Sequence, residues 1–145
     1  MVLYKSTMSN GKAKKKILFV CECNSARSQI AEGMLRKLYG HEYDAYSAGI
    51  RPGKLDPKAI KVMKEIGVDI SLHYAKDLKG YIPFKFDTLA LVCDRAAMMC
   101  EDTPKAKNTL KRGFSDPAVI NAADELEPFR KTREEMREWI KTVFG

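Results

Sequence analysis

The sequence predicts one α/β domain in three layers, with a central four-stranded parallel sheet and helices on both faces. Three observations predict this class. Four strand-like segments alternate with segments that have the apolar period of helices. Two of the strand-like segments are continuous apolar runs, which are typical of strands covered on both faces. The chain has 145 residues, of which 45% are apolar and 31% charged, as expected for one soluble domain with one core.

The first half of the sheet is predicted from two strands and the helix between them. Residues 17–20 form the first strand, and residues 25–39 form a helix. The apolar stripe of this helix consists of Ile30, Met34, Leu35 and Leu38. A second strand over residues 43–47 ends at Ala48-Gly49, where a glycine favours a change of direction.

The next elements complete the predicted sheet. Asp56 and Pro57 are the expected N-cap and first residue of a helix that stops at Gly67. The residues that this helix turns inward are Ile60, Met63 and Ile66. Residues 86–93 form the third strand, and residues 108–114 form the fourth.

The last helix is expected to begin at Pro128. Its inner stripe is Phe129, Met136, Trp139 or Ile140, and Val143. In an open parallel sheet, ligands bind beyond the carboxyl ends of the strands. Cys21 and Cys93 each lie at such an end, so these two cysteines mark the predicted site.

The formal net charge of +7 comes mainly from the N-terminal segment. Residues 1–16 hold five lysines and no acidic residue, so we expect a basic, flexible tail there and the folded domain over residues 17–145. No basic patch with interleaved aromatic residues predicts nucleic-acid binding. No apolar run approaches the roughly 18 residues of a membrane span. Because the N-terminus also lacks the apolar core of a signal peptide, we expect a cytoplasmic protein.

The stretch ILFVCECNSARSQIAEG, residues 17–33, places Cys21 and Arg27 in a C-x5-R pattern between a strand and a helix. Such a loop directs backbone N–H groups toward one point, where the helix dipole adds partial positive charge. The guanidinium of Arg27 matches two oxygens of a tetrahedral oxyanion. A thiol in this setting ionises more readily than a free cysteine, whose pKa is about 8.5. The pattern therefore predicts a thiolate nucleophile that faces a bound phosphate-like anion.

The segment VCECNSARSQIAEG resembles the phosphate loop of low molecular weight protein tyrosine phosphatases, and more closely that of the thioredoxin-coupled arsenate reductases that share their fold. The reductases typically have C-x-x-N-S-x-R-S-Q-x-A-E-G, whereas the phosphatases usually have proline where this chain has Gln29. The resemblance extends over residues 16–145 and implies the same fold, with Cys21 as the nucleophile and Arg27 as the oxyanion clamp. The other residues of the oxyanion loop and its support would be Glu22, Cys23, Asn24, Ser25, Ala26 and Ser28.

By this resemblance, Asn24 would fix the loop conformation and the hydroxyl of Ser28 would support the thiolate. Cys23 departs from the pattern, since both families commonly have glycine there, and often a second cysteine at the position of Ala26. Because glycine permits unusual backbone angles, Cys23 could change how the loop sits. It could also form a disulfide with Cys21, act as an alternative resolving thiol, or be a passive substitution, and the sequence leaves these alternatives open.

A second pair of cysteines, Cys93 and Cys100, lies in the segment LVCDRAAMMCEDTP. In a helix, α-carbons seven positions apart are about 10 Å from each other, whereas a disulfide needs no more than roughly 7 Å. The pair can therefore close only if the segment bends or unwinds, and the acidic residues around it favour a mobile surface segment over a rigid core helix. Two unrelated cysteines are one alternative. A structural zinc site built from all four thiols is another, although C-x-C and C-x6-C are not the usual zinc spacings.

The resemblance to the arsenate reductases gives this pair a redox role, because those enzymes have two redox cysteines with the same separation after the corresponding strand. It implies that Cys21 attacks arsenate, that Cys93 attacks the Cys21 sulfur as arsenite leaves, and that Cys100 then attacks Cys93. Thioredoxin or a similar dithiol would reduce the resulting Cys93–Cys100 disulfide. No metal or organic cofactor is required.

Asp116 precedes Pro117 in the stretch LKRGFSDPA. By the same resemblance, this aspartate is the general acid that protonates the leaving oxygen, although Asp-Pro is also a common turn element. The tyrosine phosphatases typically have aromatic residues next, which help to grip phosphotyrosine. Ala118 and Val119 follow here instead, which weakens the phosphatase interpretation.

The resemblance also suggests a monovalent-cation site for potassium close to the loop. The residues that would form it together with Asn24 are Glu32, Ser47 and Asp77. The spacing from His73 to Asp77 is one residue longer than the pattern of those reductases. His41 and His73 have no partner visible in the sequence, so we expect surface or hydrogen-bonded histidines.

Three functions are compatible with these motifs. The favoured one is reduction of arsenate to arsenite through the three-cysteine relay. The second is a low molecular weight protein tyrosine phosphatase that acts through a phosphocysteine intermediate, for which Cys21, Arg27 and Asp116 suffice. The third is a thiol redox sensor or oxyanion-binding module. Cys100 discriminates between the first two, because only the reductase needs it for repeated turnover.

Overall fold

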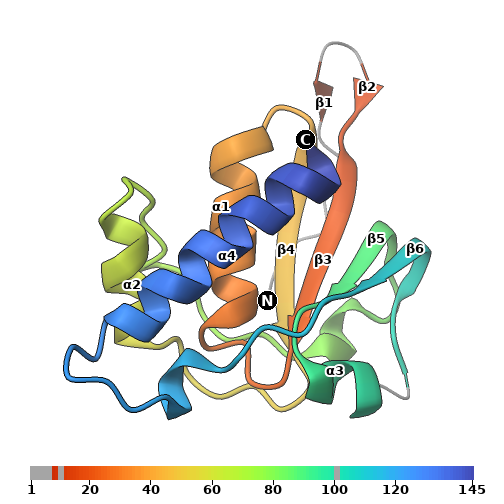
Figure 1. Cartoon of the computed structure of the whole chain (residues 1–145). Helices are drawn as coiled ribbons and strands as arrows, with labels where there is room; N and C mark the ends of the chain where they lie inside the picture. Colours follow the sequence, from red (N-terminus) through yellow and green to blue (C-terminus); the bar gives the residue numbers. More distant parts are fainter. Residues whose placement is uncertain (1–7, 10–11, 100–101) are drawn as a thin grey trace.

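The computed structural model describes residues 8–9, 12–99 and 102–145. The main sheet is parallel and has the strand order β4-β3-β5-β6, which confirms the predicted four-stranded sheet (Figure 1). Its strands are β3 (Lys15–Cys21), β4 (Tyr43–Gly49), β5 (Lys85–Leu91) and β6 (Lys105–Lys111). The helices are α1 (Arg27–Tyr39), α2 (Pro57–Lys64), α3 (Asp94–Met99) and α4 (Glu127–Phe144), with 3-10 helices η1 (Leu78–Tyr81) and η2 (Pro117–Val119). A short hairpin of β1 (Met8–Ser9) and β2 (Lys12–Ala13) precedes them.

Strand β3 lies at the centre of the sheet, between β4 and β5. Residues 17–20 are at most 1% exposed, as their continuous apolar run predicts. The register pairs Ile17 with Ala45 of β4 and with Thr88 of β5. Because all the strands run in the same direction, their carboxyl ends meet at one edge, at the bottom of Figure 1. This edge is where the two predicted site cysteines come together.

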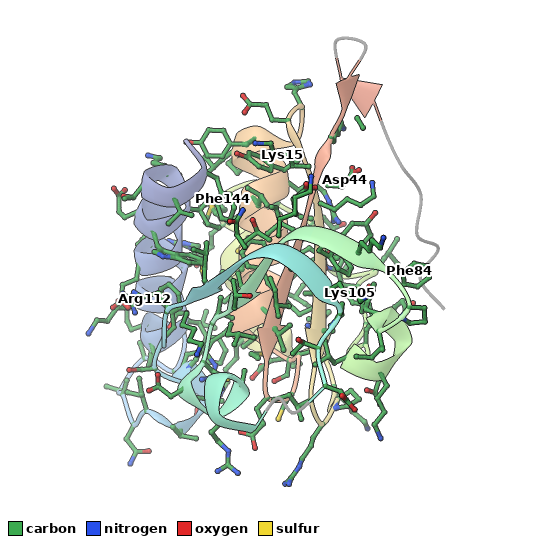
Figure 2. The ribbon with its side chains drawn as sticks, turned by 90° about the vertical axis from the view of Figure 1, so that its right-hand side faces the viewer. Lys15, Asp44, Phe84, Lys105, Arg112 and Phe144 are labelled. Atoms are coloured by element: carbon green, nitrogen blue, oxygen red, sulfur yellow. The ribbon has the colours of Figure 1, made fainter. Side chains whose placement is uncertain are left out.

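Aromatic side chains attach the layers on both sides of the sheet. On one side, the ring of Phe19 in β3 contacts Trp139 and Phe144 of α4, with ring centroids 6.4 and 6.1 Å apart. On the other side, Tyr46 of β4 contacts Tyr81 of η1, with centroids 6.1 Å apart. Figure 2, seen toward the β6 edge, shows α4 on one side of the sheet and the segment that leads to Phe84 on the other.

The last helix confirms most of the predicted inner stripe. Phe129, Met136 and Ile140 are at most 1% exposed. Val143 was predicted to point inward but is 38% exposed, and the neighbouring Phe144 is buried against β3 in its place. Within the described ranges, no helix combines the length and the apolar character of a membrane span.

The fourth strand was predicted three residues too late. Strand β6 starts at Lys105, because its register with β5 pairs Lys105 with Lys85. It is an edge strand whose residues are mostly exposed, so no apolar alternation marks its beginning. Phe114, predicted as its last residue, lies beyond it and packs against Trp139 with ring centroids 5.6 Å apart.

Two further segments differ from the sequence-based expectation. Residues 15 and 16, expected in the flexible tail, are part of β3, and the ammonium of Lys16 lies 3.7 Å from the carboxylate of Asp44. The acidic segment after Cys93, expected to be a mobile surface segment, forms the short helix α3 over Asp94–Met99, and its mobility stays a prediction. Cys100 lies outside the described residues.

Helix α4 is tied to the end of α2 by ion pairs on Glu65. Arg130 and Arg133 donate hydrogen bonds of 2.8 and 2.7 Å to its carboxylate, and these bonds lower the pKa of Glu65 to about 2. In the unfolded chain a glutamate has a pKa of about 4.3. The ionised carboxylate therefore stabilises the fold above about pH 4.3, and this contribution is lost as the pH falls toward about 2.

We expect the substitution Glu65→Gln to lower the melting temperature at pH 6. The difference from the parent should shrink as the pH is lowered from 4.5 to 2, because the parent then loses the same charge. Melting followed by circular dichroism across this range measures the effect. Glu138→Gln, which removes an exposed carboxylate of α4, is the matched control and should show no such trend. A difference in melting temperature between Glu65→Gln and the parent that stays constant with pH would contradict a stabilising role of the ionised Glu65.

Candidate active site

The loop that connects β3 to α1 is held from outside by the chain after β4. Carbonyl oxygens of the loop accept backbone hydrogen bonds of 2.8 to 3.2 Å from this segment. The pairs are Cys21 with Ile50, Glu22 with Arg51, Cys23 with Gly53, and Ser25 with Asp56. Among the described residues, the N–H groups of Cys23, Ser25 and Ala26 have no hydrogen-bond acceptor. A loop with outward carbonyls and free N–H groups is suited to binding an anion.

The loop comes so close to the end of β4 that only glycine fits at position 49. A Cβ atom on Gly49 would lie 2.8 Å from the backbone nitrogen of Asn24 and from the carbonyl carbon of Cys23. Asn24 itself has a φ of 52°, in the left-handed region that asparagine tolerates better than most residues. This turn delays the start of α1 to Arg27, two residues after the predicted start. Gly49 is thus a site residue that the sequence marked only as the end of a strand.

The thiol of Cys21 is 2% exposed and is surrounded by donors. Its Sγ lies 2.9 Å from the Oγ of Ser28 and accepts a 3.2 Å hydrogen bond from the N–H of Asn24. The side-chain amide of Asn24 donates a 2.7 Å bond to the same Oγ. Because that oxygen already accepts a hydrogen bond, its own proton is free to point at the sulfur. The hydroxyl of Ser28 and the N–H of Asn24 can thus both donate to the sulfur of Cys21.

Gln29 fixes Asn24 from behind the loop. Its fully buried amide donates hydrogen bonds to the side-chain and main-chain oxygens of Asn24, at 3.0 and 3.2 Å, and to the carbonyl of Tyr74, at 3.0 Å. Its oxygen lies 3.0 Å from the Nδ1 of His73. His73 is thus hydrogen-bonded, whereas His41 is exposed. The family pattern singled out Gln29, but no sequence signal showed that it holds the loop.

Arg27 extends from the start of α1 toward the segment after β6. Its Nη1 donates a 3.1 Å hydrogen bond to the carbonyl of Phe114, and its Nη2 lies 3.7 Å from the carboxylate of Asp116. Phe114 is anchored in the core, so the guanidinium has a fixed support. Asp116 also caps η2 by accepting a 3.0 Å bond from the N–H of Ala118. The structure therefore places the predicted oxyanion clamp and the predicted acid side by side.

Cys93 follows β5 at the same edge of the sheet and is 1% exposed. Burial raises the pKa of its thiol, and the negative charge of a Cys21 thiolate acts in the same direction. The N–H of Ala96, which donates a 3.2 Å bond to the sulfur, and the charge of Arg27 oppose this effect. The N–H of Val92 donates a 2.9 Å hydrogen bond to the carbonyl of Val20, so the residues that follow them, Cys93 and Cys21, lie side by side at the ends of neighbouring strands. At rest Cys93 is therefore a neutral thiol beside the predicted nucleophile.

Cys23 lies in the same loop but is partly exposed. Burial raises the pKa of its thiol, with smaller contributions of the same sign from Glu22 and Cys21. Glu22 points instead toward α3, where its carboxylate pairs with Arg95 at 3.1 Å. Cys23 is thus a protonated thiol at neutral pH, which makes it a weaker nucleophile than a thiolate.

A buried carboxylate, that of Glu32, lies behind the loop on α1. It accepts a 2.7 Å hydrogen bond from the hydroxyl of Ser47, so the structure brings these two predicted residues together. The ammonium of Lys76 lies 3.4 Å from the same oxygen, and Arg36 pairs with the other oxygen at 3.1 Å. Asp77 does not join this cluster, because it is exposed and its carboxylate caps η1 by accepting from the N–H of Lys79.

The four-cysteine zinc alternative finds no support in the part of the chain that the structure describes. There, no group of three or more histidine, cysteine, aspartate or glutamate residues is arranged to hold a metal ion. Cys100, which that site would need, is outside this part.

Comparisons with known proteins agree with this fold. A model of the low molecular weight phosphotyrosine protein phosphatase family matches residues 16–143. The arsenate reductase of Halalkalibacterium halodurans is 43% identical over 131 residues, which cover 89% of this chain and 94% of the relative. A solved arsenate reductase in its phosphate-binding state superposes with a TM-score of 0.78 at 27% identity, covering 89% of this chain and 95% of that one. The low molecular weight protein tyrosine phosphatase of T. tengcongensis gives a TM-score of 0.74 at 26% identity, with coverages of 90% and 98%.

Proposed function

Because this chain belongs to the low molecular weight phosphotyrosine protein phosphatase family, we propose that it is an arsenate reductase in which Cys21, Cys93 and Cys100 form a disulfide relay. Curated relatives that are 36 to 43% identical over at least 88% of this chain are arsenate reductases. The observation that carries the proposal is the second buried thiol, Cys93, at the end of the strand next to that of Cys21. A phosphatase needs one thiol at this edge of the sheet, whereas a reductase that draws electrons from cysteines needs two.

In the first step, the thiolate of Cys21 attacks the arsenic of a bound arsenate. Arg27 and the free N–H groups of the loop would hold the arsenate oxygens. A sulfur–arsenic bond forms and an arsenic–oxygen bond breaks, and the leaving oxygen takes a proton from Asp116 to depart as water. No electrons are transferred in this step, so arsenic stays pentavalent.

In the second step, Cys93 attacks the sulfur of Cys21. The new sulfur–sulfur bond forms as the sulfur–arsenic bond breaks. The electron pair of the sulfur–arsenic bond stays on arsenic, which is thereby reduced and leaves as arsenite. Cys93 must lose its proton to attack. The N–H of Ala96 and the charge of Arg27 both favour its thiolate, and consumption of the Cys21 charge in the first step removes an opposing influence.

In the third step, Cys100 attacks Cys93 and releases Cys21 as a thiolate. Helix α3 fills the interval between the two cysteines. A helical path of seven residues would keep their α-carbons about 10 Å apart, which exceeds the span of a disulfide. Formation of the Cys93–Cys100 bond therefore requires α3 to unwind. The unwound segment would present the disulfide to a thioredoxin-like dithiol in a reducing compartment such as the cytoplasm.

Hydrolysis of aryl phosphates is expected as a weak second activity. Phosphate and arsenate have nearly the same shape and charge, and the hydrolytic reaction needs only the thiolate of Cys21, the clamp of Arg27 and the acid Asp116. Asp116 is followed by small or aliphatic residues rather than by an aromatic one, and Val119 is 77% exposed. The residues that directly follow Asp116 thus offer no ring to stack on a phosphotyrosine.

Arsenite production with a thioredoxin system tests the relay. The parent chain should turn over many times, because the dithiol regenerates the enzyme. Cys100→Ser should release at most one arsenite per chain and then stop, since its oxidised form holds a Cys21–Cys93 disulfide. Quantifying arsenite per mole of enzyme separates the two results.

Aryl phosphate hydrolysis by the same two preparations provides the control. Both should hydrolyse the phosphate at the same slow rate, because Cys100 takes no part in that reaction. If neither preparation makes arsenite while both hydrolyse the phosphate through Cys21, the chain is a phosphatase and the relay is wrong.

A further inference from the structure

Behind the loop, the carboxylate of Glu32 is buried and needs compensation. The residue is 4% exposed, and an isolated charge at such a position is strongly disfavoured. The hydroxyl of Ser47 donates one hydrogen bond to it, which solvates the charge without neutralising it. A positive partner must therefore complete the site.

Lys76 is the buried cation next to this carboxylate. Its side chain is 9% exposed and its ammonium lies 3.4 Å from the oxygen that also accepts from Ser47. Arg36 pairs with the other oxygen, but its side chain is 52% exposed, so water weakens that pair. His73 lies 3.4 Å from Glu32, and burial lowers its pKa, which leaves it neutral at neutral pH.

The backbone of Lys76 joins this charge to the reactive thiol. Its N–H donates a 2.9 Å hydrogen bond to the side-chain oxygen of Asn24. The amide of Asn24 bonds the hydroxyl of Ser28, which contacts the sulfur of Cys21. The carbonyl of Lys76 accepts a 2.8 Å bond from the N–H of Gly49, so residue 76 is fixed on both sides. Displacement of Lys76 would therefore move Asn24.

The residues suggested for potassium do not fit that ion. Two of them, Glu32 and Ser47, come together, but the second carboxylate of the set, Asp77, is exposed and engaged in capping η1. The remaining carboxylate faces the ammonium of Lys76 and the guanidinium of Arg36. A potassium ion here would gain one carboxylate and meet the buried ammonium of Lys76 and, more weakly, the exposed guanidinium of Arg36, so Coulomb repulsion opposes its binding.

We propose that Lys76 is a positioning residue whose ammonium takes the place of a monovalent cation, so that the loop and its thiol are held without potassium. This inference rests on the proposed function for its kinetic consequence, but the cation effect on stability is independent of arsenate chemistry. Lys76 acts through Glu32 and Asn24 and touches no reacting atom.

Melting temperatures in potassium chloride and in tetramethylammonium chloride at equal ionic strength test the proposal. The parent chain should melt at the same temperature in both salts. Lys76→Asp should be destabilised, because it adds a carboxylate beside Glu32, and should regain roughly 4 °C in potassium at ten times its dissociation constant. Lys76→Met removes the ammonium without adding a ligand, so it should be destabilised in both salts alike. Lys79→Met, which changes a nearby exposed lysine, is the matched control and should behave as the parent.

Arsenate kinetics provide the second readout. Lys76→Met should lose roughly 10-fold to 100-fold in kcat/KM through misplacement of the loop. Potassium should restore part of this activity in Lys76→Asp only. Stabilisation of the parent by potassium, or a Lys76→Met chain as stable and active as the Lys79→Met control, would overturn the inference. If no chain makes arsenite, the proposed function fails, and the melting data still decide the role of Lys76.

Discussion

Replacing Cys21 by serine is expected to lower the rates of arsenate reduction and of aryl phosphate hydrolysis by roughly 10⁵-fold or more. A serine hydroxyl is not ionised near neutral pH, so the bond from Ser28 and the N–H of Asn24 would have no thiolate to stabilise. The fold should survive, because the two side chains are nearly isosteric. The measurement is the initial rate of each reaction at saturating substrate, together with the melting temperature of the variant.

Cys23→Ser is the matched control for this experiment, since Cys23 lies in the same loop but is partly exposed. It should keep most of both activities. A Cys21→Ser variant that retains activity would contradict the assignment of Cys21 as the nucleophile. A Cys23→Ser variant that releases only one arsenite per chain would instead make Cys23 a resolving thiol.

The second large effect is expected from Arg27→Lys, with a loss of roughly 100-fold to 1,000-fold in kcat/KM for arsenate and for an aryl phosphate alike. Lysine keeps the charge but loses the planar fork that can hold two oxyanion oxygens. It also loses the 3.1 Å bond to the carbonyl of Phe114, which orients the group toward Asp116. Steady-state kinetics with both substrates and inhibition by inorganic phosphate measure the loss.

Arg51→Lys provides the control, because Arg51 is an exposed residue that supports the loop only through its backbone N–H. It should have nearly parental kinetics. An Arg27→Lys variant that binds phosphate as tightly as the parent would contradict the role of Arg27 as oxyanion clamp.

Apolar patterns sufficed to predict the buried part of the fold. The run at 17–20 has no polar residue, and it became the central strand. The edge strand β6 has no comparable pattern, because water covers much of it, and its position follows from pairing with β5. Helix α3 was missed for a similar reason, since its six residues include two charged side chains and no repeat long enough to reveal a period.

In the candidate site, too, some contacts could be predicted from the sequence and others could not. A local motif brings Cys21, Asn24 and Ser28 together, because these residues are close in sequence. Contacts between segments that are far apart in the sequence had no motif that could predict them. A lysine at position 76 in a polar segment is typical of the surface, and only the folded chain places it against Glu32.

The disulfide formed after one equivalent of arsenate, without any external reductant, tests the relay most directly. Free thiols are blocked by alkylation and the peptides are mapped by mass spectrometry. The relay predicts one arsenite per chain, a Cys93–Cys100 disulfide and an alkylated Cys21. Four alkylated thiols and no arsenite, or a disulfide between Cys21 and Cys23, would contradict it.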